Sequence, residues 1–145
     1  MKIVTRQVKD GPLTVTIEYP EYNETVAGLI RKIGSWDIRF SASDEGRQVK
    51  IDICDVYYIE NVERKLFLYT KKDVYRLDAT MAEVEAQTAE TDFVRISRTC
   101  IMNTDHLSEI RQVKNSRLEA VLDNGEMLIV SRKYLKEIKK VFKRG

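Results

Sequence analysis

The alternation of apolar and polar residues predicts a chain built mainly from strands. Residues 13–19 alternate almost without exception, and residues 49–53 repeat the pattern before a denser apolar stretch at residues 56–59. Successive side chains of a strand point to opposite faces, so this period is typical of half-buried strands. The same pattern predicts further strands at residues 2–8, 36–40, 66–70, 74–77, 107–113, 117–122 and 126–130.

Three segments show helical spacing instead. Apolar residues recur every three or four positions over residues 23–34, which predicts an amphipathic helix. Thr80 and Glu83 have the spacing of a capping box and predict a short helix over residues 81–87. Ser131 is placed to cap a last helix. The apolar face of that helix would hold Leu135, Ile138 and Phe142.

The order of these elements predicts an α+β, β-rich protein in two parts. Residues 1–46 are interpreted as a small ββαβ unit that serves regulation or dimerisation, and residues 47–145 as a larger β domain with short helices. The first unit is too small for a CheY-like receiver and lacks the acidic pair that such a domain needs after its first strand. We therefore expect no phosphoreceiver domain in this sequence.

A basic segment at residues 92–103 carries the main functional signal. It is apolar at both ends, and Arg95 and Arg98 stand three positions apart in its middle. On a regular strand this odd spacing would point the two guanidinium groups to opposite faces, and burying one of them is unfavourable. We therefore expect the strand to break near Ser97 and to leave Arg98 on a short loop. Such a loop suits binding in a nucleic-acid groove, although most exposed arginines are simply solvated.

This segment resembles the signature of the LytTR DNA-binding domain, which is found in bacterial transcription regulators. Four other parts of the chain fit that family in the right order. They are residues 54–60, the strand pair at 66–70 and 74–77, the hairpin at 122–126, and residues 129–138. The resemblance extends over about residues 48–142, and five ordered segments are far more specific than any one of them.

The resemblance implies an elongated β domain that presents loops, rather than a recognition helix, to successive grooves of DNA. Arginines would contact base edges, while lysines and hydroxyl groups would hold phosphates. The residues at these positions are Arg64, Lys65, Ser97, Arg98, Ser131, Arg132 and Lys133. The family often has His where this chain has Ser97, which puts that contact in doubt.

The resemblance also implies partners. It predicts double-stranded DNA bound at paired direct repeats in promoters, a homodimer, and a small inhibitory membrane protein that restrains the regulator. A cytoplasmic location follows for such a protein. Nothing in the residues themselves identifies the membrane partner.

The charge distribution fits a polyanionic partner better than the net charge does. The net charge is only +2, but residues 131–145 hold seven Lys or Arg residues and one acid, Glu137, so they carry +6 and the rest of the chain −4. A local basic surface can neutralise phosphates in a salt-dependent way. The alternative interpretation is a solvated helix face.

Signals for an enzyme, a metal or another cofactor are weak. The single histidine, His106, lies in a predicted turn, and Asp52 and Asp55 would face opposite sides of a strand. Cys54 and Cys100 lie far apart among apolar residues, so we expect two buried free thiols and a reducing compartment. The sequence shows neither a signal peptide nor a run of about 20 apolar residues that could span a membrane. The alternative to a DNA-binding regulator is a non-catalytic protein-binding module with no nucleic-acid role.

Overall fold

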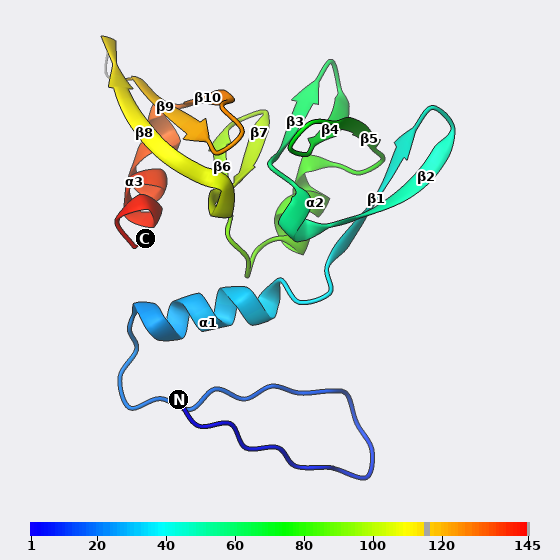
Figure 1. Cartoon of the computed structure of the whole chain (residues 1–145), viewed down its shortest axis with the longest axis vertical. Helices are drawn as coiled ribbons and strands as arrows, with labels where there is room; N and C mark the ends of the chain where they lie inside the picture. Colours follow the sequence, from blue (N-terminus) through cyan, green and yellow to red (C-terminus); the bar gives the residue numbers. More distant parts are fainter. Residues whose placement is uncertain (115–116, 145) are drawn as a thin grey trace.

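The computed structural model describes residues 1–114 and 117–144, with side chains up to residue 141 at the C-terminal end. The described residues form ten strands and three α-helices, so the predicted α+β, β-rich class is confirmed (Figure 1). The strands are β1 Arg39–Asp44, β2 Arg47–Asp52, β3 Tyr58–Val62, β4 Lys65–Tyr69, β5 Val74–Leu77, β6 Phe93–Ser97, β7 Cys100–Asn103, β8 Leu107–Val113, β9 Arg117–Leu122 and β10 Met127–Val130. The helices are α1 Glu24–Gly34, α2 Met81–Gln87 and α3 Leu135–Arg144, and the 3-10 turns are η1 Ile53–Asp55, η2 Thr104–His106 and η4 Arg132–Tyr134. None of the described helices combines the length and apolar character that crossing a bilayer requires.

The strands form two antiparallel sheets. Seven strands pair in the order β2-β1-β5-β4-β3-β7-β6, and three pair in the order β10-β9-β8. Alternate residues of the larger sheet enter two separate cores. In β7, for example, Ile101 packs with the residues around α2, and Met102 packs with the smaller sheet and α3. The strands in the middle of the molecule are therefore covered on both faces, which explains why residues 56–59 read as continuously apolar.

A β-bulge in β6 departs from the regular alternation that the sequence predicts. The pairing register between β6 and β7 shifts between Arg95 and Ser97, so Ile96 is the extra residue. Phe93 enters one core and Ile96, whose side chain is fully buried, enters the other, as their odd spacing on a strand predicts. The bulge changes the alternation only beyond Ile96, where Ser97 opposes Cys100. The strand ends at Ser97, and Arg98 lies in the turn that follows, as the sequence predicts.

The N-terminal part forms only half of the expected ββαβ unit. The predicted strands at residues 2–8 and 13–19 are wrong, because residues 1–23 make no strand pairing and are exposed apart from the partly buried Ile17. The predicted helix is present as α1. The fourth element, expected at residues 36–40, begins only at Arg39 as β1, and it pairs with β2 across the turn at residues 45–46. That hairpin spans the boundary expected at residue 46 and joins the larger sheet.

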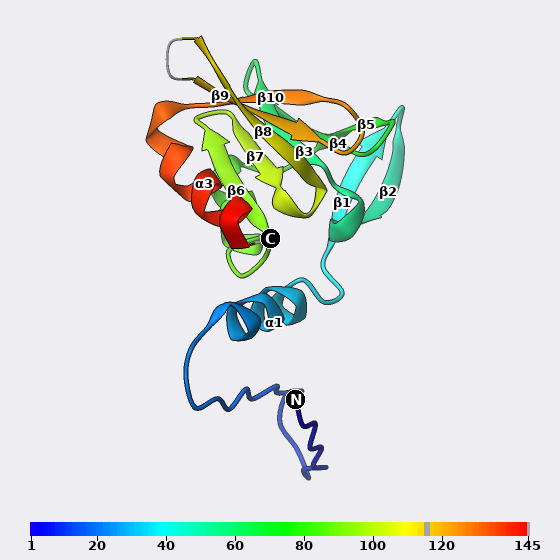
Figure 2. The same ribbon diagram turned by 60° about the vertical axis from the view of Figure 1, so that its left-hand side comes forward.

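Figures 1 and 2 place α1 below the β-rich body and the extended residues 1–23, which we call the arm, farther away still. The contact of α1 with the body includes an ion pair between Arg31 and Asp92, whose Nε and Oδ1 atoms are 2.8 Å apart. Gly34 packs so closely that a Cβ atom there would overlap the carbonyl oxygen of Glu90. The helix thus packs closely against the segment between α2 and β6, whereas the residues of the arm are exposed apart from the partly buried Ile17.

Candidate nucleic-acid interface

The turn between β3 and β4 presents the first pair of predicted site residues. Val62 pairs with Lys65, so Glu63 and Arg64 form a two-residue hairpin turn with φ angles of 52° and 67°. Such turns favour Asn-Gly, because both positions need left-handed backbone. Here they hold two large charged residues, and Arg64 and Lys65 are exposed. Strain of this kind is often found where a side chain serves binding.

The turn between β6 and β7 presents the exposed side chain of Arg98. The backbone N–H of Thr99 donates to the Ser97 hydroxyl oxygen at 3.2 Å, so Ser97 supports the turn itself. The N–H of Asn61 donates to the carbonyl oxygen of Thr99 at 2.7 Å. This last bond fixes the turn beside the end of β3, and therefore beside the turn that carries Arg64.

The segment after β10 presents the third group. The N–H of Ser131 donates to the carbonyl oxygen of Ile96 at 2.8 Å, which holds the end of β10 against the end of β6. Arg132 and Lys133 follow in η4 and are exposed, and the Lys133 ammonium lies 5.6 Å from the ring centre of Tyr134. Ser131 precedes η4 and makes no side-chain capping bond, so its predicted role as the cap of α3 is wrong.

The sequence-predicted face of α3 is supported as far as the described side chains reach. Ile138 is fully buried in the core shared with the smaller sheet, and Leu135 packs against that core. The side chain of Phe142 lies outside the described residues, as do those of Lys143 and Arg144 in the basic tail. The exposed lysines of α3 that are described are Lys136, Lys139 and Lys140.

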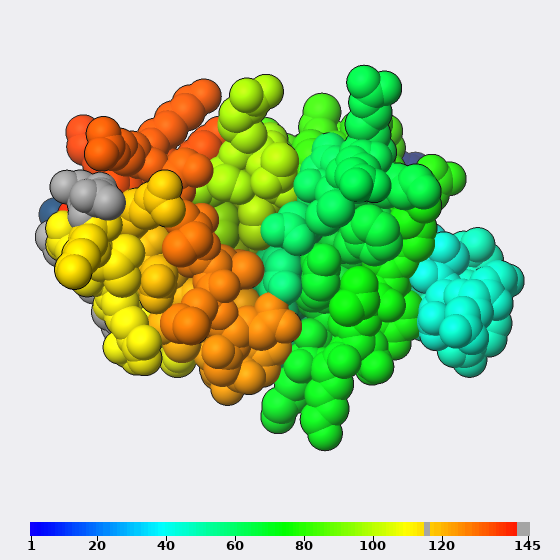
Figure 3. All heavy atoms as spheres, turned by 90° about the horizontal axis from the view of Figure 1, so that it is seen from above, coloured from blue at the N-terminus to red at the C-terminus, as the bar shows by residue number. Residues whose placement is uncertain are grey.

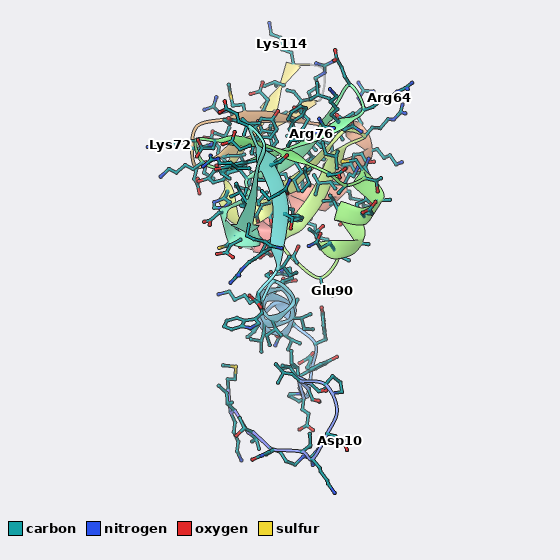
Figure 4. The ribbon with its side chains drawn as sticks, turned by 90° about the vertical axis from the view of Figure 1, so that its right-hand side faces the viewer. Asp10, Arg64, Lys72, Arg76, Glu90 and Lys114 are labelled. Carbon is teal, nitrogen blue, oxygen red and sulfur yellow. The ribbon has the colours of Figure 1, made fainter. Side chains whose placement is uncertain are left out.

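These three segments, residues 63–65, 97–99 and 131–133, lie at one edge of the molecule, which we call the basic edge. The hydrogen bonds at Asn61 and Ser131 link the segments in that order. Figure 3 shows the orange, yellow-green and green parts of the chain that contain them in a row along one side. In Figure 4, Arg64 projects from the body near the end opposite the arm residue Asp10. All seven predicted site residues therefore belong to one continuous surface, with five exposed cations.

Sequence reasoning missed Arg117 at the start of β9. Arg117 lines a shallow hollow of about 450 Å³ together with residues 129–132, so it adds a basic residue to this part of the basic edge. No motif marks Arg117, because its place beside Ser131 depends on the pairing of β9 with β10, in which Leu118 opposes Val130. Only the register of that hairpin could have identified it.

His106 has a structural role. Its ring stacks on Tyr57 with centroids 3.9 Å apart, Nε2 lies 2.7 Å from the carbonyl oxygen of Cys54, and Nδ1 lies 3.1 Å from Asp123. The hydroxyl of Tyr57 also donates to Asp123. This arrangement ties η2 to η1, to the residue before β3 and to the turn between β9 and β10, and both ring nitrogens have partners.

Two predictions about residues 52–55 are wrong. Cys54 is exposed, because η1 turns Ile53 into the core and the thiol outward, whereas Cys100 is buried as expected. The same turn brings Asp52 and Asp55 to one side, where their carboxylates and the thiol lie within 4.8 Å of one another. Partial burial, and then the charges of Asp55 and Asp52, raise the pKa of the Cys54 thiol. All three groups are exposed, so this cluster by itself indicates solvated acids rather than a metal site.

Comparison with known families identifies the larger part of the chain. The sequence model of the LytTr DNA-binding domain family matches residues 46–143. That range begins in the turn between β1 and β2 and contains all three segments of the basic edge.

The chain is also similar to proteins that are named as sensory transduction or transcriptional regulatory proteins. The chain is 33% identical over 85 residues to the sensory transduction protein LytT of Enterococcus faecalis, a match that covers 59% of this chain and 35% of the relative. It is 30% identical over 95 residues to LytT of Bacillus cereus, which covers 66% of this chain and 39% of the relative. It is also 31% identical over 72 residues to the transcriptional regulatory protein LytR of Staphylococcus aureus, which covers 50% of this chain and 29% of the relative. The matches thus span less than two fifths of these relatives.

A solved structure shares the fold. The LytTr DNA-binding domain of a Bacillus cereus protein superposes with a TM-score of 0.67 at 21% identity, covering 72% of this chain and 95% of that domain. The arrangement of strands described above is therefore that of a LytTr domain.

Proposed function

The chain belongs to the LytTR DNA-binding domain family, and from this premise we propose that it is a sequence-specific transcription regulator that reads promoter repeats. The observation that supports this most is the convergence of three basic segments, distant in sequence, on one edge. The names of the LytT and LytR relatives agree with a regulatory role.

We assign six of the seven edge residues to two kinds of DNA contact, and the seventh, Ser97, to support of the turn. Arg64, Arg98 and Arg132 are suited to base edges or a narrow minor groove, because a guanidinium group can pair bidentately with guanine. Lys65, Lys133 and the hydroxyl of Ser131 are suited to phosphate oxygens, which set the register of the protein on the duplex. Ser97 would contribute mainly by supporting the turn, since its hydroxyl accepts the Thr99 N–H.

The first test measures binding to duplexes that the purified chain selects from a random-sequence pool. We expect the logarithm of the affinity to fall linearly with the logarithm of the salt concentration, with a slope of about −0.9 per neutralised phosphate. We expect Arg98→Ala and Lys133→Ala each to weaken binding by about 1–3 kcal/mol.

Lys72→Ala is the matched control. Lys72 is an exposed lysine in the turn between β4 and β5, at the opposite end of β4 from Arg64, and Figure 4 shows the two on opposite sides of the body. Its removal should leave the affinity unchanged. A slope near zero, with no enriched sequence, would instead favour a protein-binding module without a nucleic-acid role.

We further propose a homodimer in which the arms of two copies associate. Ten of the fourteen exposed large hydrophobic side chains among the described residues lie in residues 1–36. Leu13 is 94% exposed, Val15 58% and Trp36 80%, although residues 13–19 alternate like a half-buried strand. A second copy offers the same alternating strand, and a two-fold axis makes such a surface complementary to itself. The arm lies away from the basic edge, so this association leaves the proposed DNA surface open.

A small inhibitory membrane protein is the other partner that we propose for the N-terminal residues, with the regulator itself acting in the cytoplasm. Residues 1–46 would then have a regulatory role without phosphoryl chemistry, since this described stretch contains one helix and one strand rather than a receiver fold. Co-purification of a tagged membrane candidate with the full chain, but not with a chain lacking residues 1–23, tests this assignment.

A further inference from the structure

Arg95 makes three contacts that converge on the turn carrying Arg98. Its Nε donates to the carbonyl oxygen of Ser97 at 2.9 Å, and a terminal nitrogen donates to the carbonyl oxygen of Arg98. The other terminal nitrogen pairs with the carboxylate of Glu85 in α2. Each guanidinium nitrogen thus has its own acceptor, and two of the three acceptors are backbone atoms of one turn.

Both backbone groups of Thr99 are also held. Thr99 donates its N–H to the Ser97 hydroxyl, and its carbonyl oxygen accepts the N–H of Asn61. The turn is therefore fixed to β3 on one side and, through Arg95 and Glu85, to α2 on the other. The Arg98 side chain is exposed while the backbone beneath it is bound at several points.

We propose that Arg95 is a positioning residue that sets the backbone of residues 97–99, so that Arg98 enters the DNA groove in a fixed direction. The inference rests on the proposed function, because it concerns how that surface is held. Arg95 itself is turned toward the protein, with only 26% of its side chain exposed, and contributes through Arg98 rather than by touching DNA.

The chemistry of the guanidinium group explains why Arg is needed here. Its donors lie in a rigid planar fork and can serve three acceptors at once, whereas a lysine ammonium is a point charge on a flexible stem. Arg95→Lys therefore keeps the charge and the ion pair with Glu85, but it no longer donates hydrogen bonds to the carbonyl oxygens of Ser97 and Arg98 at the same time. This substitution separates positioning from electrostatic attraction.

The first experiment needs no DNA. Amide hydrogen exchange of Thr99 in the full-length protein should become on the order of tenfold faster in Arg95→Lys, while amides in the middle of β3 and β7 keep their protection. Arg39→Lys is the matched control, because Arg39 also pairs with carboxylates but lies on β1, remote from β6 in the sheet. An unchanged Thr99 amide would overturn the proposal.

The second experiment is a double-mutant cycle with the selected duplex. Arg95→Lys should weaken binding by on the order of tenfold in the parent protein, but less than about twofold when Arg98 is already Ala, because residues that act through one another are not additive. The salt slope should stay the same, since the charge is kept. A tenfold loss in both backgrounds would mean direct contact by Arg95 and would overturn the inference. If the parent selects no duplex, the proposed function fails, and the exchange experiment alone decides whether Arg95 holds the turn.

Discussion

At the scale of single residues, Arg64 shows a conflict between stability and binding. It occupies the left-handed second position of a two-residue turn, a place that suits glycine. We expect Arg64→Gly to raise the free energy of unfolding by about 0.5–1 kcal/mol, because left-handed backbone costs a side chain ~1–2 kcal/mol and the flexibility of Gly offsets part of the gain. The same change should weaken DNA binding and make the salt slope less steep by about 0.9. Urea denaturation and binding titrations measure the two effects.

Gly46 provides the matched comparison. It holds the equivalent position in the turn between β1 and β2, with φ of 83°, and a Cβ added there would have no heavy atom within 4 Å beyond its chain neighbours. Gly46→Ala should lower the free energy of unfolding by about 1 kcal/mol through backbone strain alone. If Arg64→Gly were destabilising while Gly46→Ala behaved as stated, Arg64 would be serving the fold and not the binding surface.

Tyr57 predicts a pH dependence. Its hydroxyl donates to Asp123, and this hydrogen bond, together with burial, raises the pKa of Tyr57 to about 12. The unfolded tyrosine has a pKa of about 10, so the bond's contribution is fully present below pH 10 and is lost as the pH rises toward 12. Tyr57→Phe should lower the free energy of unfolding by roughly 1.5–3 kcal/mol at neutral pH, as expected for a hydrogen bond to a charged group. The variant should also lose less of its free energy of unfolding than the parent as the pH rises above about 10. Urea denaturation from pH 7 to 11.5 measures the free energy of unfolding of both proteins. Tyr22→Phe is the control, because the Tyr22 side chain is 61% exposed. If the free energy of unfolding of Tyr57→Phe fell with pH as steeply as that of the parent, the prediction would be contradicted.

At the scale of elements, α1 offers two glycines with opposite expectations. A Cβ at Gly28 would lie 3.6 Å from the Arg31 side chain, an ordinary contact, whereas one at Gly34 would overlap the backbone of Glu90. Gly28→Ala should therefore stabilise the helix by about 0.5–1 kcal/mol. Gly34→Ala should destabilise its packing by about 1–3 kcal/mol and loosen the Arg31–Asp92 ion pair.

Hydrogen exchange of the α1 amides distinguishes these outcomes from global unfolding. Gly28→Ala should slow exchange within α1, and Gly34→Ala should accelerate it while β3 and β7 stay protected. Equal protection in both variants would show that α1 is not held by its fit to Glu90.

The sequence predicts most elements because each has its own local signal. Thr80 caps α2 as predicted, because its hydroxyl accepts the N–H of Glu83 at 3.1 Å, although the Glu83 carboxylate accepts from that hydroxyl and not from the Thr80 N–H that a full capping box uses. The Asn124–Gly125 turn closes the hairpin of β9 and β10. A local pattern of apolar and polar residues cannot show which other strand a predicted strand pairs with. Residues 13–19 alternate as well as any strand here, yet they pair with nothing in the described chain, because α1 holds them away from both sheets.

At the scale of the whole molecule, the resemblance identified the edge residues, but their assembly depends on long-range pairing. Arg64, Arg98 and Arg132 lie along one edge because β3, β7 and β6 are neighbours and because β10 is anchored to Ile96. The sequence shows Arg95 only as one of two arginines whose odd spacing would send them to opposite faces of a regular strand. Its role depends on the bulge at Ile96 and on the position of α2, which brings Glu85 to it.

The separation of the arm from the basic edge leads to a last prediction, about assembly. If two arms associate through their alternating apolar faces, a charge placed on such a face should break the dimer, because an unpaired carboxylate strongly disfavours burial. We expect the full chain to sediment as a concentration-dependent dimer and Val15→Asp to sediment as a monomer, with weaker binding to paired repeats but unchanged binding to a single one. Val74→Asp, at a 51% exposed site on β5, is the control and should remain a dimer. A parent chain that stays monomeric at tens of micromolar, or a Val15→Asp variant that stays dimeric, would show that the arm serves another partner.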